Sequence, residues 1–138
     1  IQYTGRGEDI SPELYLSAID GRAKSLAVIM ADMNHPIPAY NHWIIWNIPV
    51  MEIIPENIAY GAYVAELGGA VQGRGYGKNR YRGPKPPFNW LHLYQFNVYV
   101  LDCLLDLSFK ARKGNLIAAM QGHILQKGAL TGYFQSHR

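Results

Sequence analysis

The sequence RGPKPPFNWLHLY, residues 82–94, decides the fold, because a proline-rich loop runs here directly into an aromatic, β-branched segment over 92–102. Each proline has a fixed φ and no backbone N–H, so these residues predict a stiff loop rather than a strand. Period-two alternation in the following strand places His92, Tyr94 and Phe96 on one face. We therefore expect His92 and Tyr94 at the mouth of an apolar face, where a small polar pocket can form beside the loop.

Length and composition indicate one folded domain over residues 1–138. Apolar residues make up 49% of the chain and charged residues 17%, which excludes a disordered chain. A chain of 138 residues is long enough to bury a sizeable core. No apolar run approaches the roughly 20 residues of a membrane-spanning helix, so we expect no integral membrane segment.

The single cysteine, Cys103, excludes an internal disulfide, and we expect a buried thiol that packs as a small hydrophobe. A cytoplasmic location is expected. The chain starts at Ile1 rather than at methionine, so a further N-terminal segment, a removed signal peptide, and a periplasmic or secreted location stay open.

Charge is distributed unevenly along the chain. Residues 1–71 hold 3 basic and 8 acidic side chains, whereas residues 72–138 hold 10 and 2, which makes the two halves −5 and +8. Residues 74–85 contain five cations and no acid. This basic loop is expected to be solvated and to attract anionic ligands toward an adjacent pocket. Its interleaved glycine and tyrosine residues are also typical of some nucleic-acid-binding segments, but the acidic first half leaves no wide basic face, so we expect no nucleic acid partner.

Hydrophobic periodicity predicts a mainly β protein with one late helix. Three strong strands are predicted over 24–32, 42–48 and 92–102. Shorter strands are predicted near 13–18, 106–109 and 129–135. The spacing of Leu116, Ile117, Met120 and Ile124 predicts a helix over about 113–125. Residues 51–71 are expected to be mainly loop, and 72–91 form a long connection of a kind that is usually functional or mobile in a compact domain.

Polar residues lie at the ends of the three strong strands. Alternation places Asp32 on the face of Leu26, Val28 and Met30. It places His42 with Ile44, Trp46 and Ile48. A carboxylate on such a face needs partners, because an unpaired buried charge is costly. From the pattern alone, structural residues with satisfied hydrogen bonds are the favoured interpretation of Asp32, His42 and His92.

Six stretches in order resemble the phosphatidylethanolamine-binding protein family, in its bacterial and archaeal branch labelled Raf-kinase-inhibitor-like. GPKPPFNWLHLYQF at 83–96 resembles the family signature GPxPPxGxHRYxF. The others are SPEL at 11–14, KSLAVIMADMNHP at 24–36, HWIIWNIP at 42–49, YVLD at 99–102 and LIAAMQGHIL at 116–125. The resemblance covers nearly the whole chain and implies a Greek-key β-sandwich with one or two peripheral helices.

The resemblance also implies a small anion pocket. In the family, the first acid of DPDxP and the histidines of HWxxxN and GxHRY line it. The matching positions of this chain are Asp32, His42 and His92, and other positions of the motifs match Pro36, Pro86 and Tyr94. Protonated histidines can donate to a phosphate-like anion, and a stiff proline loop lowers the cost of ordering on binding. Asp32 can orient a histidine or pair with the ammonium of an ethanolamine headgroup.

The function implied is therefore that of a non-enzymatic protein that binds phosphate or phospholipid-headgroup ligands without a cofactor. In some relatives the family inhibits kinases or serine proteases. A second hypothesis is a protein-interaction module that uses the basic loop at 72–91, with a kinase or protease as partner. Aromatic residues of that loop could also serve a homodimer.

Two departures from the family pattern bear on anion binding. The second acid of DPDxP is Asn34 here, and the arginine of GxHRY is Leu93. If this acid and this arginine form an ion pair in other members of the family, the loss of both leaves no unpaired charge in this chain. The missing arginine also removes a bidentate anion donor. Lys85 and Asn89 replace the cysteine before the two prolines and the glycine after them.

A metal site and a hydrolase are two alternative interpretations of the sequence. Asp32, His42 and His92 resemble a facial triad or three zinc ligands, but HxH and HExxH spacings are absent, so no metal is expected. The five serines include none in GxSxG, so no nucleophile is evident. His123 is expected to be a packing or capping residue in the helix.

Overall fold

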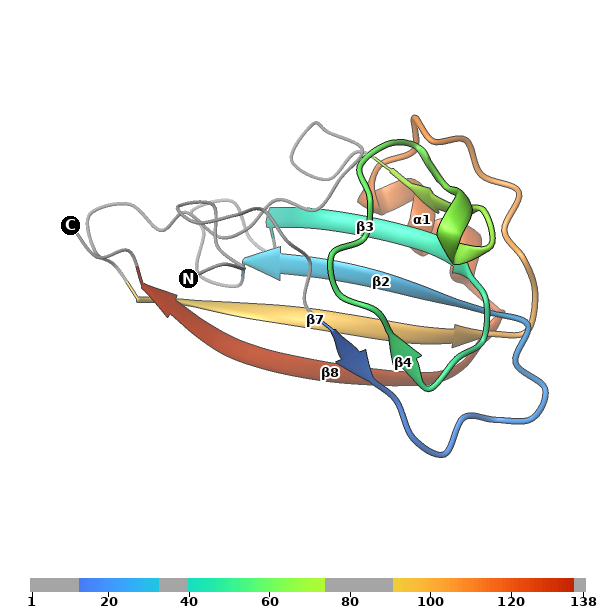
Figure 1. Cartoon of the computed structure of the whole chain (residues 1–138), viewed down its shortest axis with the longest axis horizontal. Coiled ribbons are helices and arrows are strands. Elements are labelled where there is room, and N and C mark those ends of the chain that lie inside the picture. The colour runs from blue at the N-terminus through green and yellow to red at the C-terminus, as the bar shows by residue number, and fades with distance from the viewer. Residues whose placement is uncertain (1–12, 33–39, 74–90, 136–138) are drawn as a thin grey trace.

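The computed structural model describes residues 13–32, 40–73 and 91–135, and a six-stranded antiparallel sheet dominates it (Figure 1). The strand order is β5-β6-β3-β2-β7-β8. Its long strands are β2 (Ser25–Asp32), β3 (Tyr40–Ile48), β7 (Leu91–Leu101) and β8 (Ile124–Gln135). Its short strands are β5 (Tyr63–Val64) and β6 (Ala70–Gln72).

The central strand β2 is buried on both of its faces. It pairs with β3 on one side and with β7 on the other. Every residue from Leu26 to Ala31 is at most 2% exposed. A continuous apolar run, rather than alternation with polar residues, is what a strand covered on both faces requires.

A two-stranded sheet covers one face of the large sheet. It consists of β1 (Leu14–Tyr15) and β4 (Ile53–Ile54), which lie in front of the large sheet in Figure 1. Leu14, Ile54 and Ile58 share a core cluster with Val28 and Met30 of β2. The short 3-10 helix η1 (Ala65–Leu67) adds Leu67 to the same cluster.

The opposite face is covered by α1 (Lys113–Met120) and by the segment that precedes it. Leu105, Leu116 and Met120 pack there against Ile29 and Trp46. In the described part of the chain, no helix is long and apolar enough to cross a membrane. The mainly β sandwich class predicted from the sequence is therefore confirmed, with one core cluster between the two sheets and a second between the large sheet and α1.

Several predicted element boundaries were wrong. The segment 51–71 is mainly loop, as expected, but it also contains the short elements β4, β5 and η1 and most of β6, which were not predicted. No strand forms at 106–109. The helix ends at Met120 rather than at 125, because Gln121 is extended and Gly122 has a φ of 83°. The closing strand consequently begins at Ile124, five residues earlier than expected.

The predicted common face of β3 is also corrected. Ile44 and Trp46 pack on the α1 side, whereas Ile48 packs on the β1–β4 side. Asn47 lies between them with a φ of 56°, at a register shift against β2. Its side chain donates to the Leu105 carbonyl at 2.9 Å and accepts from the Leu105 N–H at 2.8 Å. Asn47 interrupts the regular alternation of side chains between the two faces of β3, so Ile48 lies on the opposite face from the one predicted. The hydrogen bonds of the Asn47 side chain hold the backbone in this irregular conformation.

Candidate functional site

The strand ends that carry the predicted pocket residues meet at one end of the sheet. β2 ends at Asp32, and both β3 and β7 begin there, as Figure 1 shows on the side away from α1. The backbone register makes Asp32 the direct partner of Tyr40 on β3 and of Tyr94 on β7. The backbone therefore brings the ends of three separate motifs together.

His92 and His42 occupy different positions relative to that pair. His92 lies two residues before Tyr94 on β7, where its partner is Phe134 of β8. His42 lies on β3 between Asn41, the partner of Ala31, and Trp43, the partner of Met30. The register of β3 against β2 shifts at this point. The prediction that His42 shares a face with Ile44 assumed regular alternation, which a register shift interrupts.

Other parts of the predicted pocket lie outside the described structure. Pro36 and Pro86 belong to the segments 33–39 and 74–90, which are not among the described residues. The side chains of Asp32, His42, His92 and Tyr94 are likewise outside the description. The pocket thus stays a prediction, and the register of the strand ends is the part of it that can be described.

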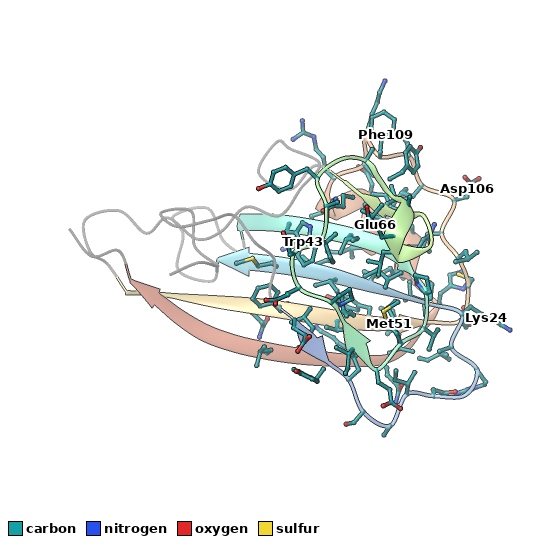
Figure 2. All side chains as sticks on the ribbon, viewed as in Figure 1. Lys24, Trp43, Met51, Glu66, Asp106 and Phe109 are labelled. Atoms are coloured by element: carbon teal, nitrogen blue, oxygen red, sulfur yellow. The ribbon has the colours of Figure 1, made fainter. Side chains whose placement is uncertain are left out.

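A buried glutamine next to these strand ends was not predicted from the sequence. Gln72 of β6 is 0% exposed. Its side-chain oxygen accepts from Trp43 Nε1 at 2.8 Å, and its amide nitrogen donates to the carbonyls of Ala59 and Gly61 at 2.8 and 2.9 Å. Trp43 lies at the start of β3 among the core side chains in Figure 2. The signal in the sequence was that Gln72 is a polar residue at the end of Ala70–Gln72, whose other two residues are apolar.

Gly73, the residue after Gln72, is also fixed in position by its neighbours. The Gly73 N–H donates to the Ile44 carbonyl at 3.1 Å. A Cβ at Gly73 would lie 2.6 Å from Trp46 Cζ3 and 2.7 Å from the Ala111 carbonyl oxygen. Residues 72–73 therefore fix the point from which the connection containing Pro86 departs.

A hollow of about 460 Å³ lies elsewhere on the molecule, between the N-terminal segment and strands β7 and β8. Apolar residues such as Leu14, Val98 and Leu130 contribute much of its lining. Glu13 and Lys127 are the charged residues among its lining side chains. One carboxylate and one ammonium give no net attraction for an anion, so this hollow does not replace the predicted pocket at the strand ends.

A second polar cluster lies at the other end of β7. Asp102 Oδ1 and His123 Nδ1 are 2.8 Å apart, and candidate ligand atoms of Asp102, Cys103 and His123 all lie within 4.8 Å of one another. Burial, followed by the charge of Asp102 and a hydrogen bond to it, raises the pKa of the Cys103 thiol.

The expectations for two of these residues need correction. Cys103 is partly rather than fully buried, although it packs against the core cluster on the α1 side as expected. His123 is in the turn before β8 and not in the helix, and its side chain is 47% exposed. His123 was expected in the helix because the apolar residues around it follow helical spacing.

The family model for phosphatidylethanolamine-binding proteins matches residues 1–135. A UPF0098 protein of Pyrococcus abyssi is 42% identical over 136 residues, which cover 97% of this chain and 76% of that protein. A UPF0098 protein of Methanothermobacter thermautotrophicus is 40% identical over 139 residues, covering 97% and 88%.

Solved structures give a matching result. A putative phosphatidylethanolamine-binding protein homolog from Chlamydia trachomatis superposes with a TM-score of 0.82 at 32% identity, over 99% of this chain and 88% of that one. YbcL of E. coli, described as a new member of the mammalian family of these proteins, superposes with a TM-score of 0.81 at 25% identity, over 95% and 83%. Sequence and structure comparisons therefore point to the same family.

Proposed function

Because this chain belongs to the phosphatidylethanolamine-binding protein family, we propose that it is a non-enzymatic protein that binds small anions of the phosphate or phospholipid-headgroup type. The proposed pocket lies where β2 ends and β3 and β7 begin. The observation that carries the proposal is the backbone pairing of Asp32 with Tyr94, which joins two of the family's motifs across adjacent strands.

Each proposed pocket residue has a chemical role. His42 and His92 donate to the anion when protonated, and Asp32 pairs with a ligand ammonium or orients a histidine. Tyr94 contributes a hydroxyl, and prolines 36 and 86 shape the mouth.

Leu93 stands where the family has arginine, so a permanent cation is missing there and histidine charge supplies most of the attraction. An unperturbed histidine has a pKa of about 6.5, so binding should weaken as the pH rises from 6 to 8.

The experiment is an NMR titration with O-phosphoethanolamine that follows the imidazole signals of His42 and His92 between pH 6 and 8. We expect saturable shifts in both, with weaker binding at pH 8. His42→Ala and His92→Ala should each abolish binding. The matched control is His137→Ala, which removes a histidine outside the family motifs.

Two results would contradict the proposal: no shift at high ligand concentration, or unchanged affinity in both alanine variants. The second candidate function would then lead, namely a protein-interaction module. The observation in its favour is the run of five cations without an acid in residues 74–85. Deleting those residues would abolish binding to a kinase or protease partner under that hypothesis and spare small-anion binding.

A further inference from the structure

The turn between α1 and β8 and the residues that follow β7 are held together by backbone hydrogen bonds. The Asp102 N–H donates to the His123 carbonyl at 3.0 Å, and the His123 N–H donates to the Met120 carbonyl at 2.9 Å. Ser25 Oγ, on a residue that is 0% exposed, donates to the Cys103 carbonyl at 2.6 Å. The backbones that present Asp102, Cys103 and His123 are therefore fixed independently of any contact between the three side chains.

These side chains offer a thiol sulfur, an imidazole nitrogen and a carboxylate oxygen within 4.8 Å of one another. Zinc binds such atoms at about 2.3, 2.0 and 2.1 Å in tetrahedral sites, which places the ligand atoms roughly 3.3 to 3.8 Å apart. The side chains of His123 and Asp102 are 47% and 41% exposed, which leaves them room to rotate into that arrangement. We propose that Asp102, Cys103 and His123 form a three-ligand site for Zn²⁺ or another late first-row divalent cation.

Local charge agrees with a divalent cation. A thiolate and a carboxylate together offset two positive charges, and a neutral imidazole completes the set. Arg22 is a cation whose charge acts on Asp102. Its guanidinium is already paired with Asp20, at 2.7 Å from Nη2 to Oδ2, so it leaves the Asp102 carboxylate available. On cation binding the thiol proton of Cys103 passes to solvent.

A nucleophilic thiol in a Cys-His-Asp arrangement is the competing interpretation. Such a thiol requires a lowered pKa, provided by a nearby cation or a helix N-terminus. Here the charged side chain beside the thiol is the Asp102 carboxylate, an anion rather than a cation. The His123 ring also faces Asp102 through Nδ1. A metal ion supplies the positive charge that the cluster lacks, which favours the cation site.

Cobalt(II) provides a sharp test, because a thiolate ligand gives Co²⁺ an intense near-ultraviolet charge-transfer band. Cys103 is the only cysteine in the chain, so the band can arise only from this residue. We expect saturation at one Co²⁺ per chain and displacement by Zn²⁺. Cys103→Ser should abolish the band, and His123→Gln should lower Co²⁺ affinity at least tenfold.

Asp106→Asn is the matched control, since it removes an exposed carboxylate four residues from Asp102. Asp106 points outward, away from the sheet, in Figure 2, and its replacement should leave the affinity unchanged. Three outcomes would overturn the proposal. They are the absence of a band in excess Co²⁺, an unchanged affinity in His123→Gln, and saturation at half an equivalent per chain, which would mean one cation shared between the thiolates of two chains. Thermal unfolding of the apo variants establishes that they are folded.

Discussion

At the scale of single residues, Gln72 connects three parts of the chain. Its side chain joins Trp43 on β3 to the carbonyls of Ala59 and Gly61 in the segment before β5. A buried amide satisfied by three partners stabilises the fold and fixes geometry, whereas the same groups without partners are costly. The position next to the start of the pocket strand β3 gives this residue a structural role in the proposed site.

Gln72→Leu keeps the approximate volume of the side chain but leaves the buried Trp43 Nε1 and two carbonyls without this partner. We expect a loss of unfolding free energy on the order of 1 to 3 kcal/mol. Urea denaturation measures it. Gln121→Leu, at an exposed position, should change the free energy by no more than about 0.5 kcal/mol. Equal effects of both substitutions would contradict the role assigned to Gln72.

Asp20 and Arg22 give a prediction about pH. Hydrogen bonds from the Arg22 side chain and backbone lower the pKa of Asp20 from 3.8 to about 2. Because the folded-state pKa is lowered, the pair's contribution to stability is present above pH 3.8 and is lost as the pH falls through about 2. The pair is exposed to solvent, so this contribution is small.

The measurement is an NMR titration of the Asp20 carboxyl carbon. In the native chain we expect its midpoint near pH 2, and in Arg22→Gln a midpoint that rises toward 3.8. The same midpoint in both proteins would show that Arg22 is not the cause of the lowered pKa.

At the scale of elements, strands β2, β3 and β7 could be predicted from sequence, whereas β4 and β5 and the first residues of β8 could not. β2 is a buried apolar run, and β7 has aromatic or β-branched residues at every second position from 94 to 100. β4, β5 and β6 have only two or three residues each. β4 pairs with β1, β6 pairs with β3, and β5 pairs with β6. These short strands therefore depend on tertiary contacts, which the local sequence pattern does not predict. The helix was predicted too long because Ile124 continues the apolar spacing past the turn at Gly122.

The junction after β6 yields a prediction for Gly73. Gly73→Ala places a methyl group 2.7 Å from the Ala111 carbonyl oxygen and 2.7 Å from Ile44 Cδ1, so the backbone or the core must shift. We expect a destabilisation of about 1 to 3 kcal/mol, measured by thermal or urea unfolding.

Gly128→Ala is the matched control. Gly128 is an exposed strand residue, and a Cβ built there meets nothing within 4 Å. It should be neutral or slightly stabilising because alanine restricts the unfolded chain. Similar losses at both glycines would mean that packing around Gly73 is not the cause.

At the scale of the whole molecule, the fold class could be predicted from the sequence, whereas the cluster of Asp102, Cys103 and His123 could not. The family resemblance implied that Asp32 and Tyr94 line one pocket, and the register shows that the two residues are backbone partners on adjacent strands. Cys103 and His123 are 20 positions apart, and their proximity depends on where α1 ends. A helix extended to 125 would have carried His123 away from the sheet. The side chains of the anion pocket remain a prediction.

The two proposed sites lie at opposite ends of the sheet. β7 runs for 11 residues between them, a length of roughly 35 Å in an extended strand. Anion binding at one end and cation binding at the other therefore involve different side chains and can be tested independently. Failure of either experiment leaves the other proposal standing.

The central position of β2 also sets the order in which the chain can assemble in time. Its pairing with β3 is local, since Asp32 and its partner Tyr40 are 8 positions apart. Its pairing with β7 joins Ser25 to Leu101, which are 76 positions apart (101 minus 25). Long-range pairing loses the entropy of closing a large loop before its hydrogen bonds and contacts stabilise the structure, so proteins with such topologies fold slowly. On the ribosome we expect β2 and β3 to pair first, which leaves two free edges. β6 pairs with the β3 edge next along the chain, and β7 covers the β2 edge only when most of the chain has been made.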